Sequence, residues 1–564
     1  MNRVCKTCGN GFEITEDDLK FYDNVSPIFN GKKYLIPSPT LCPDCRQQRR
    51  SLFRNERTLF QNKCALCKKD VVSVYSPDKG YKVFCKECWW SDNWDPFDYG
   101  RNFDFNKPFF EQFDALLKEV PHPALLSAKS ENCDFTHLAD NNKNCYLLFL
   151  SGECEDVQYG YWLNDCKDCF DLSHSGQSEL CFELTFSKDC YHLFYSHDCG
   201  QCRDGYFLDN CTGCNDCIMC SGLIHKSYYF NNKSLTKEEF FKKKEEFLKS
   251  LPAKLTDYKK QFREMMSSAL KEYSHLVNAE NCSGDYLVNC KNCHNCYSMN
   301  DCEDCKYCYD ILRTKNTYDA SVFGKPGELL YEINDVGLNS VSTLFTSFAY
   351  SLSNSLYCKY CFNTANLFGC SGIKGHKQFC ILNKKYTKDE YENLVGKIIE
   401  YMQKIGEWGE FFDPKISMFG YNETVANEYF PLTKDQAVKK GFKWSDFVNP
   451  PPKAEKVITV ENMEVIPGDI SEIPDEIVNW ALTCEVSGKL YKITKQELKF
   501  YKDHNLPIPK RHPDQRHKDR MTLINPRKLY DRKCMKCGAD IKTTYSPQRP
   551  EIVYCEACYL KEVY

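Results

Sequence analysis

The sequence predicts a multidomain, mainly β protein in which small cysteine-based modules at both ends flank a cysteine-rich repeat region with helical insertions. Three observations lead to this prediction. The chain of 564 residues is too long for one hydrophobic core. Paired C-x2-C motifs occur near both ends with the same spacing. Between residues 131 and 233 the cysteines recur at a regular separation, which indicates a repeat architecture.

The motif C-x2-C-x17-C-x2-C occurs twice. Its cysteines are Cys64, Cys67, Cys85 and Cys88 and, 470 residues later, Cys534, Cys537, Cys555 and Cys558. The copies also agree outside the cysteines, as in VVSVYSP and IKTTYSP. Four thiolates at this spacing predict a tetrahedral zinc site in a zinc ribbon or treble clef. A catalytic zinc needs an open coordination position, so we expect these sites to be structural.

A related module begins the chain, with the knuckles Cys5/Cys8 and Cys42/Cys45. Between them, TEDD at 15–18 predicts a capped helix, and a helix after the second knuckle is typical of a treble clef. The pattern C-x2-C…F-x-I-T…FY…C-P-D-C-R over residues 3–50 resembles the bacterial family of probable zinc-ribbon domains. The layout of the chain also resembles uncharacterised zinc-ribbon, cysteine-rich repeat proteins of small uncultured bacteria. The resemblance implies an architecture and no particular activity. The three intact sets of four cysteines predict about three structural Zn²⁺ ions.

A decayed copy of the first module is predicted at residues 476–524. YKITKQELKFY at 491–501 repeats FEITEDDLKFY at 12–22, and HPDQRHKDR at 512–520 repeats CPDCRQQRR at 42–50. Of the four ligand positions, Cys484 and His512 remain. Two ligands do not close a structural zinc shell, so we predict that this copy is metal-free. In the alternative, His504 or His517 completes the site.

An arginine-rich stretch follows the second knuckle of the first module. It contains Arg46, Arg49, Arg50 and Arg54, and a similar basic stretch occupies the matching C-terminal place. The arginine side chain binds phosphate in a bidentate manner and is always charged. These residues therefore predict an RNA or DNA contact, and the alternative is a solvated helix face with scattered acidic residues.

Cysteines of the middle region recur 21 residues apart, as in Cys133/Cys154 and Cys169/Cys190. A period near 20 in short strands predicts turns of a parallel β-helix. Asn or Asp often precedes the cysteine, and both tolerate the left-handed conformation at tight corners. We therefore interpret the cysteines as small, buried, reduced side chains. Two alternatives remain open: an iron–sulfur cluster in the run Cys211–Cys220, and additional zinc or copper sites.

The two halves of the middle region end alike. CSGLIHKSYYFNNKSLTKEEF at 220–240 parallels CSGIKGHKQFCILNKKYTKDEY at 370–391, and TKEE and TKDE predict helix N-caps. We therefore divide the chain as follows: 1–60 zinc ribbon or treble clef, 61–100 second ribbon, 101–130 connector, 131–233 β-helix-like repeats, 234–274 helical hairpin, 275–386 second repeat region, 387–447 helical segment, 448–475 linker, 476–524 decayed ribbon and 525–564 C-terminal ribbon.

The composition restricts the function. The net charge is −4, so any nucleic-acid contact must come from a local basic patch. No apolar run of membrane-spanning length, signal peptide or catalytic motif is present, which predicts a cytoplasmic, non-enzymatic protein without membrane contact. The leading hypothesis is a zinc-binding scaffold that contacts nucleic acid. The alternatives are a protein-interaction or assembly module and a thiol-based metal-binding or redox protein.

Overall fold

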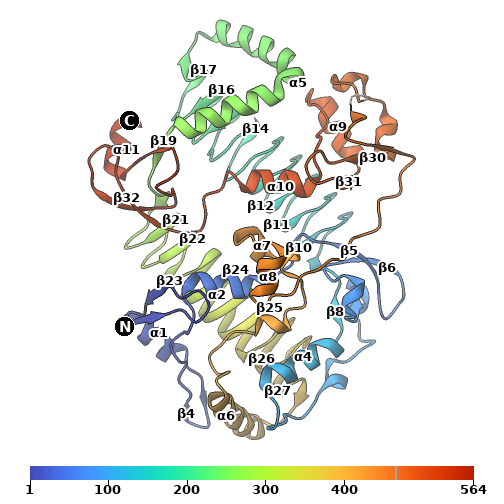
Figure 1. Ribbon diagram of the computed structural model, residues 1–564, viewed down its shortest axis with the longest axis vertical. Helices are drawn as coiled ribbons and strands as arrows, with labels where there is room; N and C mark the ends of the chain where they lie inside the picture. The colour runs from blue at the N-terminus through green and yellow to red at the C-terminus, as the bar shows by residue number, and fades with distance from the viewer. Residues whose placement is uncertain (464–465, 564) are drawn as a thin grey trace.

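The computed structural model describes residues 1–463 and 466–563; for residues 323–325 only the backbone is described. Two stacks of short chain turns form the centre of the molecule, and small modules from both ends of the chain lie against them (Figure 1). Residues 464 and 465, within the predicted linker 448–475, lie outside the described part.

The N-terminal modules occupy about the first hundred residues and are followed by a connecting helix. Their elements are β1 (Asn2–Val4), β2 (Gly11–Glu13), α1 (Glu16–Val25), β3 (Ile28–Phe29), β4 (Lys32–Lys33), α2 (Pro43–Ser51), β5 (Phe60–Lys63), β6 (Asp70–Ser73), β7 (Val83–Phe84), α3 (Lys86–Trp90), α4 (Phe109–Glu119) and β8 (His122–Pro123). Thr15 and Asp18 form the predicted capping box of α1.

The first stack covers residues 127–234 and the second covers residues 276–385. The first contains β9 (Ser127–Ala128), β10 (His137–Asp140), β11 (Phe149–Gly152), β12 (Tyr161–Asn164), β13 (Ser173–Gly176), β14 (Tyr191–Phe194), β15 (Arg203–Asp209), β16 (Asn215–Ser221), β17 (Ser227–Phe230) and β18 (Lys233–Ser234). The second contains β20 (Leu276–Val277), β21 (Ser283–Val288), β22 (His294–Asn300), β23 (Glu303–Lys306), β24 (Tyr309–Gly337), β25 (Ser340–Leu356), β26 (Phe362–Phe368), β27 (Gln378–Ile381) and β28 (Lys384–Lys385).

Successive turns of each stack pair in parallel, most often 12 residues apart. His137 pairs with Phe149, and Phe149 pairs with Tyr161. In the second stack Tyr297 pairs with Tyr309, although one step is 11 residues and another is 13. The predicted 21-residue period is therefore wrong as the length of a turn. Inward-facing cysteines recur at multiples of three residues, and a separation of 21 is one such multiple.

The corners of the turns explain this triplet pattern. In the first stack, every third residue has a positive φ, as at Asn132, Phe135 and Leu138. Asn or Asp before a cysteine occupies such a corner, as predicted, but aromatic and aliphatic residues such as Phe135 also occupy it. A positive φ costs free energy in a non-glycine residue, and the regular hydrogen bonds to the turns above and below maintain it.

Helical segments follow both stacks. α5 (Lys237–Ser268) contains Pro252, and the rings of Phe247 and Tyr258 lie 4.9 Å apart, so the helix doubles back on itself (Figure 1). β19 (Leu270–Glu272) leads from it into the second stack. After the second stack come α6 (Lys388–Ile405), α7 (Val425–Tyr429) and α8 (Lys434–Lys439). Both α5 and α6 begin with the predicted capping boxes.

The C-terminal modules complete the molecule. Their elements are β29 (Lys456–Ile458), β30 (Trp480–Thr483), β31 (Leu490–Tyr491), α9 (Lys495–Asp503), α10 (Pro513–Met521), β32 (Tyr530–Lys533), β33 (Asp540–Thr543), β34 (Ile552–Tyr554) and α11 (Glu556–Val563). β29 lies inside the predicted linker and pairs with β30.

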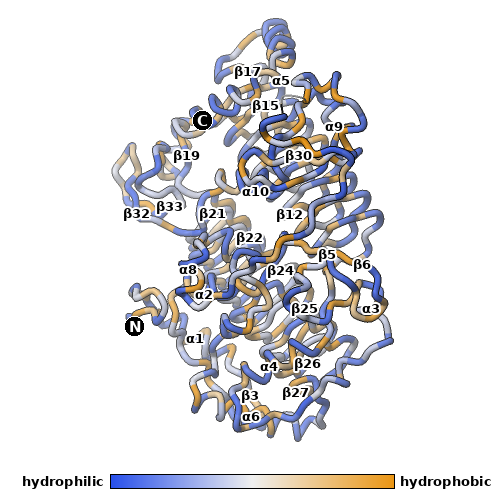
Figure 2. Tube along the Cα trace, turned by 45° about the vertical axis from the view of Figure 1, so that its right-hand side comes forward, coloured by the Kyte–Doolittle hydropathy of each residue, from blue (hydrophilic) through white to orange (hydrophobic). Residues whose placement is uncertain are grey.

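The two stacks lie side by side and run in opposite directions. His174 of the first stack lies 4.0 Å from Asp310 of the second, and Phe186 stacks on Tyr286 at 4.4 Å. Residue numbers therefore rise along one stack while they fall along the other. The C-terminal helix α10 lies against β12 and β13 of the first stack (Figure 2), whereas α1 and α2 lie against β24 of the second.

Candidate metal centres and the docking of their modules

The cysteines of the three intact modules come together in three quartets. They are Cys5, Cys8, Cys42 and Cys45; Cys64, Cys67, Cys85 and Cys88; and Cys534, Cys537, Cys555 and Cys558, and within each quartet the sulfur atoms lie within 4.8 Å of one another. These are the predicted sets, and each can hold one metal ion.

Sulfur spacing provides a test of whether a metal fits. A tetrahedral ion with bonds of about 2.3 Å places its thiolates about 3.8 Å apart. The Sγ atoms of Cys67 and Cys85 are 3.8 Å apart, as are those of Cys537 and Cys555. The donor set and its spacing therefore fit a small ion with four sulfur ligands.

Backbone amides of the knuckles also favour the thiolate form. The N–H groups of Cys67 and Cys85 donate to Sγ of Cys64 at 3.5 and 3.3 Å. Burial opposes ionisation of Cys64, but these donors outweigh it and lower the pKa of this thiol to about 6. The equivalent Cys534 has its pKa lowered to about 6 in the same way. Thiolates are the metal-binding form, so the protein backbone prepares the site.

The fourth module keeps the knuckle fold with a different set of side chains. Gly488 adopts a positive φ, its N–H bonds to the carbonyl of Cys484, and the Ser487 N–H points at the Cys484 sulfur. His512 is the N-cap of α10, where its Nδ1 accepts from the N–H of Asp514. Cys484 and His512 thus occupy ligand positions, but one ring nitrogen of His512 caps the helix.

The arginines expected to contact nucleic acid lie inside the protein, so that prediction is corrected. Arg46, Arg49, Arg50 and Arg54 have side chains exposed by 10% or less. Arg46 binds Oδ2 of Asp319 on the second stack at 2.9 Å, and Arg50 binds Oδ1 of the same residue at 3.1 Å. The neighbouring pairs are Arg49 with Glu332 and Glu410, and Arg54 with Glu56. These guanidinium groups are used inside the fold and are not available to phosphate.

The C-terminal module repeats this contact on the first stack. Arg516 and Arg520 of α10, which align with Arg46 and Arg50, bind the two oxygens of Asp171 at 2.6 and 2.8 Å. We call each such pair of arginines with its shared aspartate an arginine latch. Aromatic contacts repeat as well: Phe21 stacks on Tyr318 at 3.8 Å and Phe500 lies 4.2 Å from Phe170. The sequence repeat is therefore also a repeat of docking geometry.

Thiols inside the stacks have a common hydrogen-bonding role. Cys190 donates from Sγ to the carbonyls of Lys188 and Cys199, and its own N–H bonds to Oγ of Ser178 on the preceding turn. The N–H of Cys202, on the next turn, in turn faces the Cys190 sulfur. Ser and Thr fill the same positions elsewhere with the same bonds. Inward Cys, Ser and Thr side chains at these positions thus accept a backbone N–H of the next turn.

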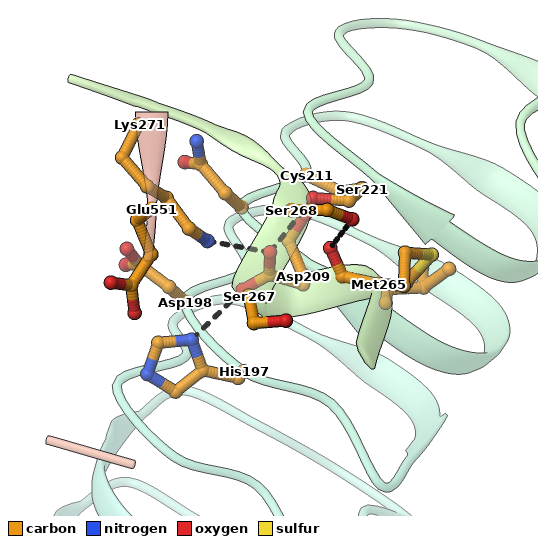
Figure 3. A network of polar contacts seen from close by, with 12 residues as sticks. His197, Asp198, Asp209, Cys211, Ser221, Met265, Ser267, Ser268, Lys271 and Glu551 are labelled. Carbon is orange, nitrogen blue, oxygen red and sulfur yellow. Dashed lines mark hydrogen bonds and ion pairs between the residues drawn. The ribbon is translucent and has the colours of Figure 1, made fainter. Parts of the chain in front are cut away.

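Other buried charges join the two stacks. Asp209 accepts hydrogen bonds from His197 at 3.0 Å, Ser221 at 2.7 Å and Lys271 at 2.6 Å (Figure 3). Lys271 lies on β19, which pairs with β34 of the C-terminal ribbon. The network therefore connects the first stack, the start of the second and the last metal module.

Comparisons with known proteins add little. No family model matches the chain, and none of the curated proteins does. One solved structure that matches part of the chain is a "putative acetyltransferase" from Desulfovibrio desulfuricans G20, with 7% sequence identity over 40% of this chain and 64% of that chain. Its TM-score is 0.09, which carries no argument about fold or activity.

The sequence analysis missed the carboxylates that receive the arginines. Asp171 and Asp319 were not singled out, although each follows an aromatic residue in CFDLS and TYDAS. Both are fully buried in the structure. An aromatic–aspartate pair repeated in both cysteine-rich regions was the available signal. Within the described residues, no helix is long and apolar enough to cross a membrane.

Proposed function

We propose that this protein is a zinc-stabilised, non-catalytic binding scaffold. The observation that carries the proposal is the composition of the three quartets, each of which consists of four cysteine sulfurs. Four thiolates fill a tetrahedral zinc shell and leave no position for water or substrate. The ions would then stabilise modules too small to fold by burial alone.

The arginine latches support the scaffold role. A terminal module that is anchored by buried ion pairs holds a fixed position on its stack. We propose that the two stacks form a parallel β-helix-like body with a short 12-residue turn, which presents rigid faces for ligands. Binding of RNA or DNA through Arg46, Arg49, Arg50 and Arg54 is not part of this proposal, because these side chains are buried.

The buried thiols argue against the alternative of a redox or metal-storage protein. Most cysteines of the stacks are buried, and their Sγ atoms donate to backbone carbonyls. Burial raises the pKa of Cys145 to about 12, so this thiol stays protonated at neutral pH. A protonated, buried thiol is a poor nucleophile and a poor metal ligand.

Metal analysis combined with cobalt substitution tests the proposal. We expect about three zinc ions per chain, and loss of one ion in each of Cys8→Ser, Cys67→Ser and Cys537→Ser. Refolding with Co²⁺ should give the intense visible bands of four-coordinate cobalt with thiolate ligands. Cys282→Ser, which changes a half-exposed cysteine of the second stack, is the control and should keep all three ions. Weak bands from a five- or six-coordinate ion would indicate an open site and contradict the proposal.

A further inference from the structure

A cavity lies between the first stack, α5 and the module of α9 and α10. Its volume is about 590 Å³, and its walls include Tyr195 from the stack, Leu255 and Arg263 from α5, and Ile508 and Arg516 from the module. Ligand pockets for small molecules typically measure roughly 300–1,000 Å³. The cavity is thus large enough for a small molecule and lies apart from the three metal quartets.

The walls are strongly basic although the whole chain has a net charge of −4. Seven basic and three acidic side chains line the cavity. Several of the basic groups are paired, such as Lys259 with Glu183. Lys260, Arg263 and Lys510 form no side-chain hydrogen bond or ion pair with any residue that the structure describes. The unpaired charge attracts an anion.

A buried arginine at the cavity wall has donors without a partner. Arg516 is 5% exposed, and its Nη1 bonds to Asp171, Glu497 and Tyr501. Its Nε and Nη2 have no hydrogen-bond partner. Both atoms are shielded from solvent, so a ligand in the cavity does not reach them without a movement of the side chain.

The N-terminal half fills the equivalent place with its own chain. There, the stack residues Phe345 and Tyr357 are covered by the ring of Trp408, with centroids 6.5 and 6.3 Å away. Two residues later, the carboxylate of Glu410 binds Arg49 at 2.6 Å and Thr40 at 2.8 Å. An aromatic ring and an anionic group thus occupy the site together.

In the C-terminal half, the place that corresponds to Trp408 and Glu410 is the open cavity. Thr40 aligns with Lys510, which lines the cavity. In the first stack, the rings of Tyr195 and Phe207 pack face to face with centroids 4.9 Å apart and form part of the cavity wall. The corresponding rings of the second stack are Phe345 and Tyr357, which Trp408 covers. Asp519 aligns with Arg49, so the partner of Glu410 is not repeated, and the part of the arrangement that the two halves share is the aromatic wall.

We propose that this cavity binds a nucleotide-class ligand, with its phosphates at Lys260, Arg263 and Lys510 and its planar base against the apolar wall. The site does not depend on the metal quartets. A failure of this proposal would leave the scaffold proposal standing, and the metal analysis tests that one separately.

Calorimetric titration of the zinc-loaded full chain with ADP tests the site. We expect one ADP per chain and at least about tenfold weaker binding in Lys260→Glu/Arg263→Glu, because two exposed cations become anions at the phosphates. The control Lys242→Glu/Lys254→Glu changes two exposed lysines of α5 that do not line the cavity, and it should bind within about twofold of the native protein.

Separate titrations with adenosine and with pyrophosphate test the two parts of the ligand. We expect each to bind more weakly than ADP. Adenosine binding as tightly as ADP would overturn the anion site, and pyrophosphate binding as tightly as ADP would overturn the ring site. Absence of ADP binding, or equal binding by the cavity variant and its control, would overturn the whole proposal.

Discussion

Single side chains in the stacks satisfy backbone groups that the turns leave unpaired. At several inward positions the backbone N–H meets a sulfur or hydroxyl on the preceding turn, as the N–H of Cys190 meets Ser178. Cys is small and apolar enough for the interior and still accepts and donates weakly. This accounts for the high cysteine content of the stacks without invoking disulfides or metal.

Substitution of Cys190 tests this role. We expect Cys190→Ser to change the unfolding free energy by about 1 kcal/mol or less, because the hydroxyl keeps the bonds and serine is native at equivalent positions. Cys190→Val should cost about 2–4 kcal/mol, since it leaves the Cys202 N–H unsatisfied and adds volume. Urea unfolding of both variants measures the difference, and equal costs would argue against the hydrogen-bonding role.

His275 makes stability depend on pH. Its Nδ1 lies 2.9 Å from Asp285 and its Nε2 lies 3.1 Å from Asp198, so both nitrogens must donate. Burial lowers the pKa of this imidazole, but the two carboxylates outweigh burial and raise it well above its usual value. The folded state therefore keeps a proton that the unfolded state loses above about pH 6.5.

We expect the His275 contribution to be fully present below about pH 6.5 and to fall by about 1.4 kcal/mol per pH unit above it. His275→Gln should remove this part of the slope, as measured by urea unfolding between about pH 6 and pH 8. His192→Gln, which alters a partly exposed ring beside Asp204, should keep it. A native slope in His275→Gln would show that another group is responsible.

Among the elements, the arginine latches determine where the modules lie. The sequence correctly indicated helices after the knuckles and capping boxes before α1, α5 and α6. It did not indicate that α2 and α10 bury their arginines, because a basic helix face looks the same in sequence whether it meets water or a buried carboxylate. The partner carboxylate lies hundreds of residues away in the chain.

Removal of the shared carboxylate should destabilise the docked module. In Asp319→Ala, Arg46 loses its close partner and Arg50 keeps only Glu332, so we expect a loss of about 3–5 kcal/mol. Asp70→Ala removes an exposed partner of Lys63 and should cost less than about 1 kcal/mol. Urea unfolding of the zinc-loaded variants compares the two costs. Similar small losses in both variants would contradict a stabilising role of the arginine latch.

At the scale of the whole molecule, each terminal module docks on the stack that is more distant from it in the sequence. The N-terminal module contacts the second stack through Asp319, and the C-terminal module contacts the first through Asp171. The chain order is therefore module, first stack, second stack, module, with each module on the stack that is more distant in sequence. The antiparallel arrangement of the stacks brings these partners together.

Limited trypsin digestion can reveal this arrangement. We expect Asp319→Ala to speed cleavage at Arg46 and Arg50, and Asp171→Ala to speed cleavage at Arg516 and Arg520, because each change undocks the module from its stack. Mass spectrometry identifies the sites. Faster cleavage of the C-terminal module in Asp319→Ala would assign the modules to the opposite stacks.

The sequence by itself determined the three cysteine quartets, the duplicated modules and the capped helices, because knuckles and caps depend on residues close together in the chain. Only the tertiary structure decided the 12-residue turn, the burial of the arginines and the cavity beside Arg516. Each of these depends on contacts between distant segments. A periodic cysteine pattern allows several turn lengths, and backbone pairing between turns selects one of them.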